Sequence, residues 1–218
     1  MKQTSNMLLT LAGELGFSVS DPEGMQNLTV SGMKFTIRTY TAPDLGHVSV
    51  MEAAGFFGLM KMDTLIITPL QKDMPLFSYD RVHAMGNDTL IFELYDTLLG
   101  QTELSALTQV KQDAANLPDH DLGAHWYDSI KLPQSLSKKG KKKDTAAFDA
   151  AADAYLRAYL QAAKNAAPCD AADKRVKAAV YVEGLLTHGG PSTDVFKKGI
   201  GEDNTAELFR KTLFATEA

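Results

Sequence analysis

Cysteine is nearly absent from this chain of 218 residues, in which Cys169 is the only one. A single cysteine cannot form an intrachain disulfide, and such a count is typical of a reducing compartment. It also cannot complete a structural zinc site with scattered histidines. The five histidines include no pair at H-x-x-x-H spacing, so we expect no metal held by the protein.

Positive charge is also scarce. The chain has 22 Lys and Arg against 27 Asp and Glu, a net charge of −5, whereas a dedicated nucleic-acid binder usually carries a strongly basic domain or patch. No run of about 18 apolar residues is present, so we expect no membrane-spanning helix. Residues 1–15 lack the continuous apolar core and cleavage site of a signal peptide. We therefore expect a cytoplasmic protein that binds neither nucleic acid nor membrane.

Three common catalytic motifs are missing. The chain contains no G-x-x-x-x-G-K-[ST], no strand-linked G-x-G-x-x-G and no G-x-S-x-G. Gly55-Phe56-Phe57-Gly58 and Gly189-Gly190 are too short to form a phosphate-binding loop. These absences argue against a P-loop enzyme, a dinucleotide-binding enzyme and a hydrolase with a nucleophile elbow.

Short apolar runs fill much of the first half of the chain, and Ser-Gly, Pro-Asp and Gly-Asn turn signals separate them. This spacing predicts antiparallel strands joined by hairpins, with a tight turn at Met85-Gly86-Asn87-Asp88. The predicted strands are Leu28–Val30, Met33–Thr41, Val48–Ala54, Met62–Pro69, Phe77–Met85 and Thr89–Tyr95.

Helical spacing marks both ends of the chain. Met7, Leu8, Leu11 and Leu15 predict a short amphipathic helix before Gly16. After about Gln101 the pattern is helical again, and the strongest segments are Ala146–Ala166, Ala171–Leu186 and Thr205–Phe214. We therefore predict one α+β domain over residues 1–218, a three-layer α-β-α sandwich whose central antiparallel sheet is flanked by helices.

The segment Ser135–Asp144 is polar, rich in lysine and low in complexity. One interpretation is a solvated surface loop that precedes a helix. The other is a docking patch for an acidic partner protein.

Asp80 ends the stretch Asp73–Asp80, which lies between apolar runs that both indicate sheet. A carboxylate inside a sheet must be hydrogen-bonded, paired or protonated, because burying a bare charge is expensive. A protonatable acid that faces a pocket is a candidate proton donor, and the alternative is a structural acid in a turn. Asp63, at the start of another apolar strand, is either a further acid or a strand-end cap.

Arg38 and Tyr40 are two residues apart on a predicted strand and therefore share one face of it. An inward-facing arginine could bind a carboxylate ligand. It could equally pair with an internal acid such as Glu52 or Glu93.

Four segments between about Thr36 and Phe214 stand out: Arg38–Pro43, Met74–Asp80, Trp126 with Leu132-Pro133, and Phe196–Glu202 through Leu213-Phe214. Together they resemble the ferredoxin-dependent bilin reductases, the phycocyanobilin and phytochromobilin oxidoreductase family. The similar elements of that family are R-x-Y-x-x-P, L-P-L-F-G-x-D, a tryptophan followed by Leu-Pro, and K-A-F-G-E…L-F.

The resemblance implies a reductase that binds a linear tetrapyrrole between the sheet and the C-terminal helices. It also implies a monomer without a tightly bound cofactor, which receives electrons from reduced ferredoxin or flavodoxin. Asp80 falls on the family's central catalytic aspartate, and Asp63 falls where the family has His or Asn. The resemblance makes Arg38 a partner for a propionate and His188 a substitute for an aspartate that falls at Gly190. The expected substrate contacts are Arg38, Tyr40, Phe77 and His188.

Because the other acidic positions of the family are changed here, two further hypotheses remain open. One is a non-catalytic tetrapyrrole-binding or carrier protein on the same fold. The other is a structural or interaction domain without a pocket.

Overall fold

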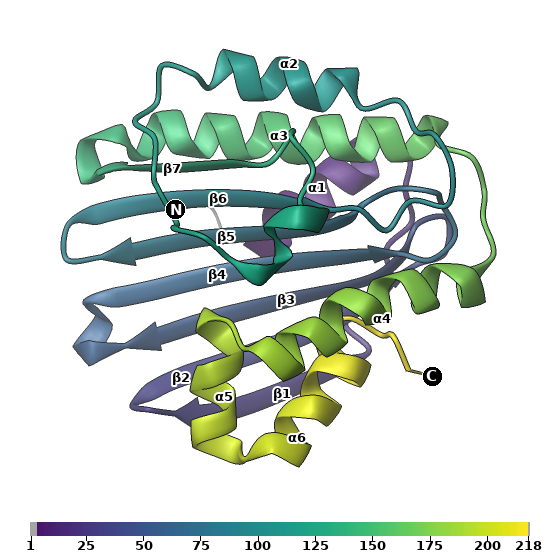
Figure 1. Ribbon diagram of the computed structural model, residues 1–218. Coiled ribbons are helices and arrows are strands. Elements are labelled where there is room, and N and C mark those ends of the chain that lie inside the picture. The colour runs from purple at the N-terminus through teal and green to yellow at the C-terminus, as the bar shows by residue number, and fades with distance from the viewer. Residues whose placement is uncertain (1–3, 218) are drawn as a thin grey trace.

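The computed structural model describes residues 4–217 and contains a seven-stranded antiparallel sheet. Each strand pairs with the next one along the chain, so the sheet is a simple meander (Figure 1). The strands are β1 (Gly24–Val30), β2 (Met33–Ala42), β3 (Gly46–Gly55), β4 (Met60–Pro69), β5 (Leu76–Ala84), β6 (Asn87–Tyr95) and β7 (Leu136–Lys141).

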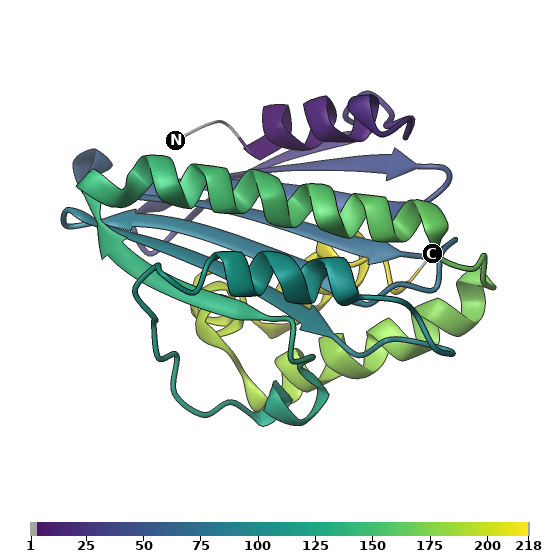
Figure 2. The same cartoon turned by 90° about the horizontal axis from the view of Figure 1, so that it is seen from above.

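Helices cover both faces of this sheet, which confirms the predicted three-layer α-β-α sandwich. On one side lie α1 (Thr4–Glu14), α2 (Ser105–Asp113) and α3 (Thr145–Asn165). On the other side lie α4 (Ala171–His188), α5 (Pro191–Ile200), α6 (Glu202–Glu207) and the π-helical turn η4 (Leu208–Leu213). Figure 2 shows the sheet between α1 and α3 on one side and α4 on the other. Short 3₁₀ turns are η1 (Phe56–Gly58), η2 (Trp126–Ile130) and η3 (Lys142–Asp144).

Strand alternation divides the apolar side chains between two cores. The core on the side of α3, here called the α3 face, contains Phe77, Phe92 and Tyr155, and the last two rings stack at 4.1 Å. The core on the side of α4, the α4 face, contains Leu76, Tyr95 and Tyr181. Neighbouring residues of one strand therefore serve different cores, and this decides which side chains can reach a common site.

The six predicted strands are confirmed, but the sequence analysis missed β7. Leu136–Lys141 pairs with β6 at the edge of the sheet, so this part of the lysine-rich segment is a strand and not a loop. Lysines are common on edge strands because they discourage pairing with a second chain. Lys138 is buried and its Nζ lies 2.6 Å from Asp119 Oδ1.

The predicted final helix Thr205–Phe214 is divided into α6 and η4. Two hydrogen bonds from β3 hold the end of η4 against the sheet. The Ser49 hydroxyl donates to the Leu213 carbonyl at 2.8 Å, and His47 Nε2 lies 2.8 Å from the Thr212 carbonyl oxygen. π-helical turns occur frequently at functional sites, and this one borders the cavity described below.

Candidate functional site

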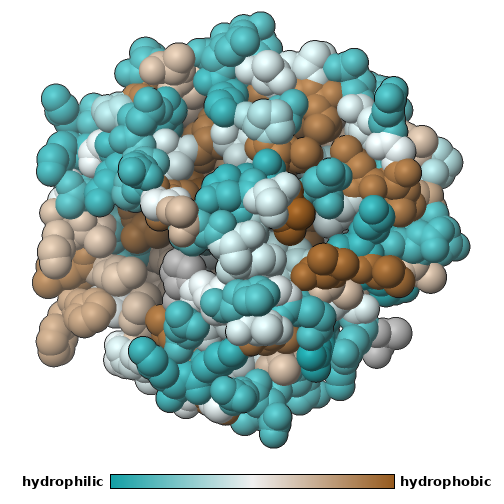
Figure 3. All heavy atoms as spheres, viewed as in Figure 1, coloured by the Kyte–Doolittle hydropathy of each residue, from teal (hydrophilic) through white to brown (hydrophobic). Residues whose placement is uncertain are grey.

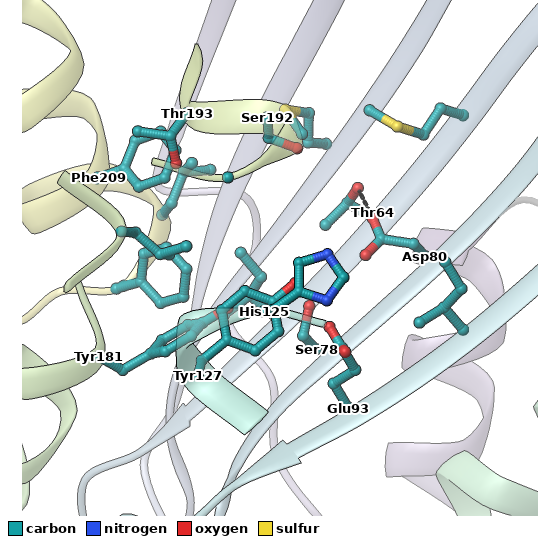
Figure 4. A pocket seen from close by; sticks show the side chains of 18 of the residues that line it. Thr64, Ser78, Asp80, Glu93, His125, Tyr127, Tyr181, Ser192, Thr193 and Phe209 are labelled. Atoms are coloured by element: carbon teal, nitrogen blue, oxygen red, sulfur yellow. Dashed lines mark hydrogen bonds between the residues drawn. The ribbon is translucent and has the colours of Figure 1, made fainter. Parts of the chain in front are cut away.

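A cavity of about 220 Å³ lies on the α4 face, between the sheet and the C-terminal helices. Its floor is formed by side chains of β3 to β6, and its opposite wall by η2, α4, the start of α5 and η4. Most of the lining is apolar or aromatic, with a few polar groups directed inward, as is usual for small-molecule sites. The polar groups include Thr64, Ser78, Asp80, Glu93 and His125 (Figure 4).

Asp80 lies near the middle of β5 and its carboxyl group points into this cavity (Figure 4). The Thr64 hydroxyl, on the neighbouring strand β4, donates a hydrogen bond to Asp80 Oδ1. Burial raises the pKa of Asp80 to about 6, the Thr64 hydrogen bond opposes this rise, and the negative charge of Glu93 adds to it. Asp80 is therefore a carboxyl group that can hold and release a proton close to neutral pH.

Glu93 is a second carboxyl group in the same cavity, contributed by β6. It stands opposite Ser78 in the register between β5 and β6, which places it diagonally across from Asp80. The Tyr95 hydroxyl donates to Glu93 Oε2 at 2.6 Å, and Lys131 Nζ lies 3.6 Å from Glu93 Oε1. The sequence analysis considered Glu93 only as a possible partner of Arg38.

Aromatic rings form the wall that faces the two acids. The rings of His125 and Tyr127 stack at 4.8 Å with an interplanar angle of 9°, and Tyr181 lines the same side. Burial raises the pKa of Tyr127 above its usual range, so its hydroxyl keeps its proton. Flat rings opposite a sheet suit a flat conjugated ligand. The sequence analysis assigned no role to His125, because nothing in its local pattern distinguishes it.

Asp63 does not share the cavity with Asp80, which corrects the expectation of a second catalytic acid at this position. It lies on the α3 face, where it accepts a hydrogen bond of 3.1 Å from the Thr4 hydroxyl of α1. Burial raises the pKa of Asp63. The physical reason is strand alternation, because Thr64 is the residue of β4 that pairs with Asp80 and faces the cavity.

Arg38 and Tyr40 share one face of β2 as predicted, but it is the α3 face and neither lines the cavity. Arg38 Nη1 lies 2.8 Å from Glu52 Oε2, so the internal ion pair is the alternative that the structure supports. Tyr40 is buried in the apolar core. The structure therefore does not support the expected contacts of Arg38 and Tyr40 with a substrate in this cavity.

Phe77 and His188 are also outside the cavity lining. Phe77 is fully buried on the α3 face, with its ring centroid 4.6 Å from that of Tyr159. It is three residues from Asp80, so the two side chains leave opposite faces of β5. His188 is exposed at the end of α4, 5.5 Å from the Trp126 ring and two residues before Gly190, which does line the cavity.

Residues 4–217 contain no recognisable metal site, because no group of three or more His, Cys, Asp or Glu side chains in this range is arranged to hold a metal ion. Within the same range, no helix combines the length and apolar character needed to cross a membrane.

Comparison with known proteins gives a match in structure but none in sequence. No protein-family model matches the chain, and no curated protein matches its sequence. A crystal structure of phytochromobilin synthase from tomato, in complex with biliverdin, has a similar fold with a TM-score of 0.76. The alignment covers 98% of this chain and 83% of that chain at 15% identity. The chain therefore shares its α+β fold with that protein.

Proposed function

We propose that this protein is an oxidoreductase of bilin-reductase type, which reduces a linear tetrapyrrole bound in the cavity on the α4 face. Electrons come one at a time from reduced ferredoxin or flavodoxin, and Asp80 supplies a proton. The observation that carries the proposal is a carboxyl group with a pKa raised to about 6 on the floor of an apolar cavity walled by aromatic rings. The fold shared with tomato phytochromobilin synthase supports the same conclusion.

Saturating one double bond of a bilin consumes two electrons and two protons. Each electron makes the conjugated nitrogens and the lactam oxygens more basic, so a nearby acid can then transfer its proton. Asp80 suits this step because it faces the ligand space and its pKa lies near neutrality. The Thr64 hydrogen bond holds the carboxyl group in place and stabilises the carboxylate after the proton has left.

The test is to add biliverdin, follow its visible spectrum, and then supply reduced ferredoxin. We expect the wild type to bind and reduce the pigment, and Asp80→Asn to bind it but reduce it about 100-fold more slowly, the usual loss for a missing general acid. Asp63→Asn is a matched control, because the same change on the α3 face leaves the cavity untouched. An Asp80→Asn variant that reduces biliverdin as fast as wild type would contradict the role of Asp80.

A tetrapyrrole carrier on the same fold is the second candidate. It is favoured by the positions of Asp63 and Arg38, since neither side chain reaches the cavity. A bound biliverdin spectrum that stays constant under reduced ferredoxin would support the carrier and exclude the reductase.

A further inference from the structure

A second cavity shares part of its lining with the first. It has a volume of about 190 Å³, and its polar lining is Glu93, His120, Asp121, Lys131, Ser135 and Ser137. We call it the polar cavity. Glu93 and Leu122 line both spaces, so Glu93 is the ionisable group that stands between the ligand cavity and the polar cavity.

The two carboxylate oxygens of Glu93 have different hydrogen-bonding surroundings. Oε2 accepts the hydrogen bond from Tyr95, while Oε1 is buried and has no hydrogen-bond donor among residues 4–217. Lys131 Nζ, 3.6 Å from Oε1, is an ion-pair partner beyond hydrogen-bonding distance. Glu93 is only 8% exposed, and a buried carboxylate oxygen without a donor is costly. Oε1 is therefore an acceptor that a water molecule or a donor group in either cavity can reach.

The register of the sheet connects this oxygen with Asp80. Ser78 and Asp80 are neighbours on the same face of β5, and Ser78 pairs with Glu93 on β6. Figure 4 shows the carboxyl groups of Asp80 and Glu93 and the hydroxyl of Ser78 directed toward the same space, with the His125 ring opposite them. A proton leaving Glu93 therefore has hydroxyl and imidazole groups beside its route to Asp80.

We propose that Glu93 is a proton relay that reloads Asp80 with protons taken from water in the polar cavity. This inference rests on the proposed function, because a two-proton reduction requires Asp80 to be protonated again. In each cycle the protonated Glu93 passes its proton to the Asp80 carboxylate and becomes a carboxylate. Glu93 then regains a proton from water on its other side. The electrons come from the iron–sulfur or flavin carrier and do not pass through Glu93.

Charges of both signs surround Glu93. Lys131 forms an ion pair with it, and the Lys131 Nζ lies 2.6 Å from Asp128 Oδ1. The Asp80 carboxylate repels it from β5. The titratable groups that face Glu93 from the surrounding elements are Asp80, Tyr95, His120, Asp121, His125, Tyr127, Asp128, Lys131 and Tyr181. Reduction rates of variants must therefore be compared over a full pH range.

The test uses Glu93→Gln, because the glutamine oxygen still accepts the Tyr95 hydrogen bond but the side chain carries no exchangeable acidic proton. We expect biliverdin binding to stay within about two-fold of wild type. We expect kcat with reduced ferredoxin to fall about ten-fold or more at every pH. Imidazole buffer, whose protonated form is a small proton donor, should restore the rate in proportion to its concentration, and Glu93→Asp should keep part of it. Glu52→Gln, an equivalent change on the α3 face, should leave both rate and binding unchanged.

The possible outcomes are distinguishable. If wild type reduces biliverdin and Glu93→Gln keeps pace, the relay is refuted while the proposed function stands. If Glu93→Gln is slow but imidazole does not restore it, Glu93 is only structural and the relay is again refuted. If wild type binds biliverdin and cannot reduce it, the proposed function fails and the relay fails with it.

Discussion

At the scale of single residues, Asp80 costs the protein stability. Its carboxyl group has a pKa of about 6 in the fold, against 3.8 for the unperturbed group. Below the unfolded value both states are protonated and no penalty exists. As the pH rises toward the pKa of the folded state, the unfolded chain releases its proton first. The free energy of unfolding therefore falls, and it stays low above that pKa. At about 1.4 kcal/mol per pH unit, the penalty reaches about 3 kcal/mol near pH 7.

Asp80→Asn should therefore stabilise the protein at neutral pH while it slows the proposed reduction. We expect a gain of up to about 3 kcal/mol near pH 7, and almost no gain near about pH 3 or below, because the acid is then protonated in both states. Urea unfolding at both pH values measures this. A loss of stability at neutral pH would contradict the assignment of Asp80 as a buried, destabilising acid.

Asp73 provides the matched control in the same segment. Burial alone would raise its pKa, but hydrogen bonds from the Leu99 amide and from Lys174 lower it. Lys174 is fully buried, with its Nζ 3.2 Å from Asp73 Oδ1. Removing one partner of a buried pair is strongly destabilising, so Asp73→Asn should lose about 3 kcal/mol or more near pH 7. The substitutions Asp73→Asn and Asp80→Asn should thus change the free energy of unfolding in opposite directions.

At the scale of secondary-structure elements, strand faces decide which site residues the sequence could predict. A tight turn was predicted at Met85-Gly86-Asn87-Asp88, and in the structure Met85 and Gly86 form the two-residue loop that fixes the register of β5 with β6. That register alone places Glu93 beside Asp80. The same alternation shows that Phe77 cannot share a face with Asp80. Both conclusions were accessible from the sequence, although the analysis did not draw them.

Other parts of the site could not be read from the sequence. The pairing of β4 with β5 crosses the loop Leu70–Pro75, whose length does not fix a register, so the face of Asp63 was undetermined. The His125 wall depends on how an irregular segment packs against α4, which no short-range pattern specifies. β7 was missed because lysines replace the usual apolar alternation at this sheet edge.

Helix α4 holds that irregular wall through Gly184. A Cβ atom at this position would lie 2.0 Å from Trp126 Cη2, so only glycine allows the indole ring to lie on the helix. The Trp126 Nε1–H donates to the Gly189 carbonyl at 3.0 Å and fixes the ring further. Glycine is unfavourable inside a helix by about 1 kcal/mol relative to alanine, and here close packing of η2 outweighs this cost.

Gly184→Ala should lower the free energy of unfolding by about 1–3 kcal/mol, because overpacking outweighs the gain in helix propensity. We also expect weaker biliverdin binding, since η2 carries Tyr127. Thermal unfolding and a biliverdin titration measure the two effects. Val180→Ala, at an exposed position of the same helix, should change stability by less than about 0.5 kcal/mol. A more stable Gly184→Ala protein would show that the Trp126 contact does not hold the wall.

At the scale of the whole molecule, one end of the sheet differs from the rest of the surface. The hairpins β3–β4 and β5–β6 both turn at this end, and they expose Phe56, Phe57, Leu59 and Met85. Figure 3 shows apolar side chains gathered along this edge of the molecule. The exposed Lys142 and Lys143 lie next to it, since the Lys142 amide donates to the Gly86 carbonyl at 3.2 Å. An apolar patch beside lysines suits an acidic partner protein.

Because the net charge of −5 opposes general attraction of an acidic ferredoxin, the electron donor of the proposed function would need a local positive site. Met62 and Val82 line the ligand cavity from strands that end at this same edge, so a donor bound there would sit close to the bilin. We therefore expect the double variant Lys142→Glu and Lys143→Glu to raise the KM for ferredoxin about ten-fold at low salt, with unchanged biliverdin binding. The difference should shrink above about 0.5 M salt, where charges are screened within a few ångströms. Lys177→Glu, an exposed change on α4 that alters the net charge half as much, is the control for net charge. If Lys177→Glu had half the effect of the double variant on log KM, the donor would respond to the charge of the whole protein and not to this edge of the sheet.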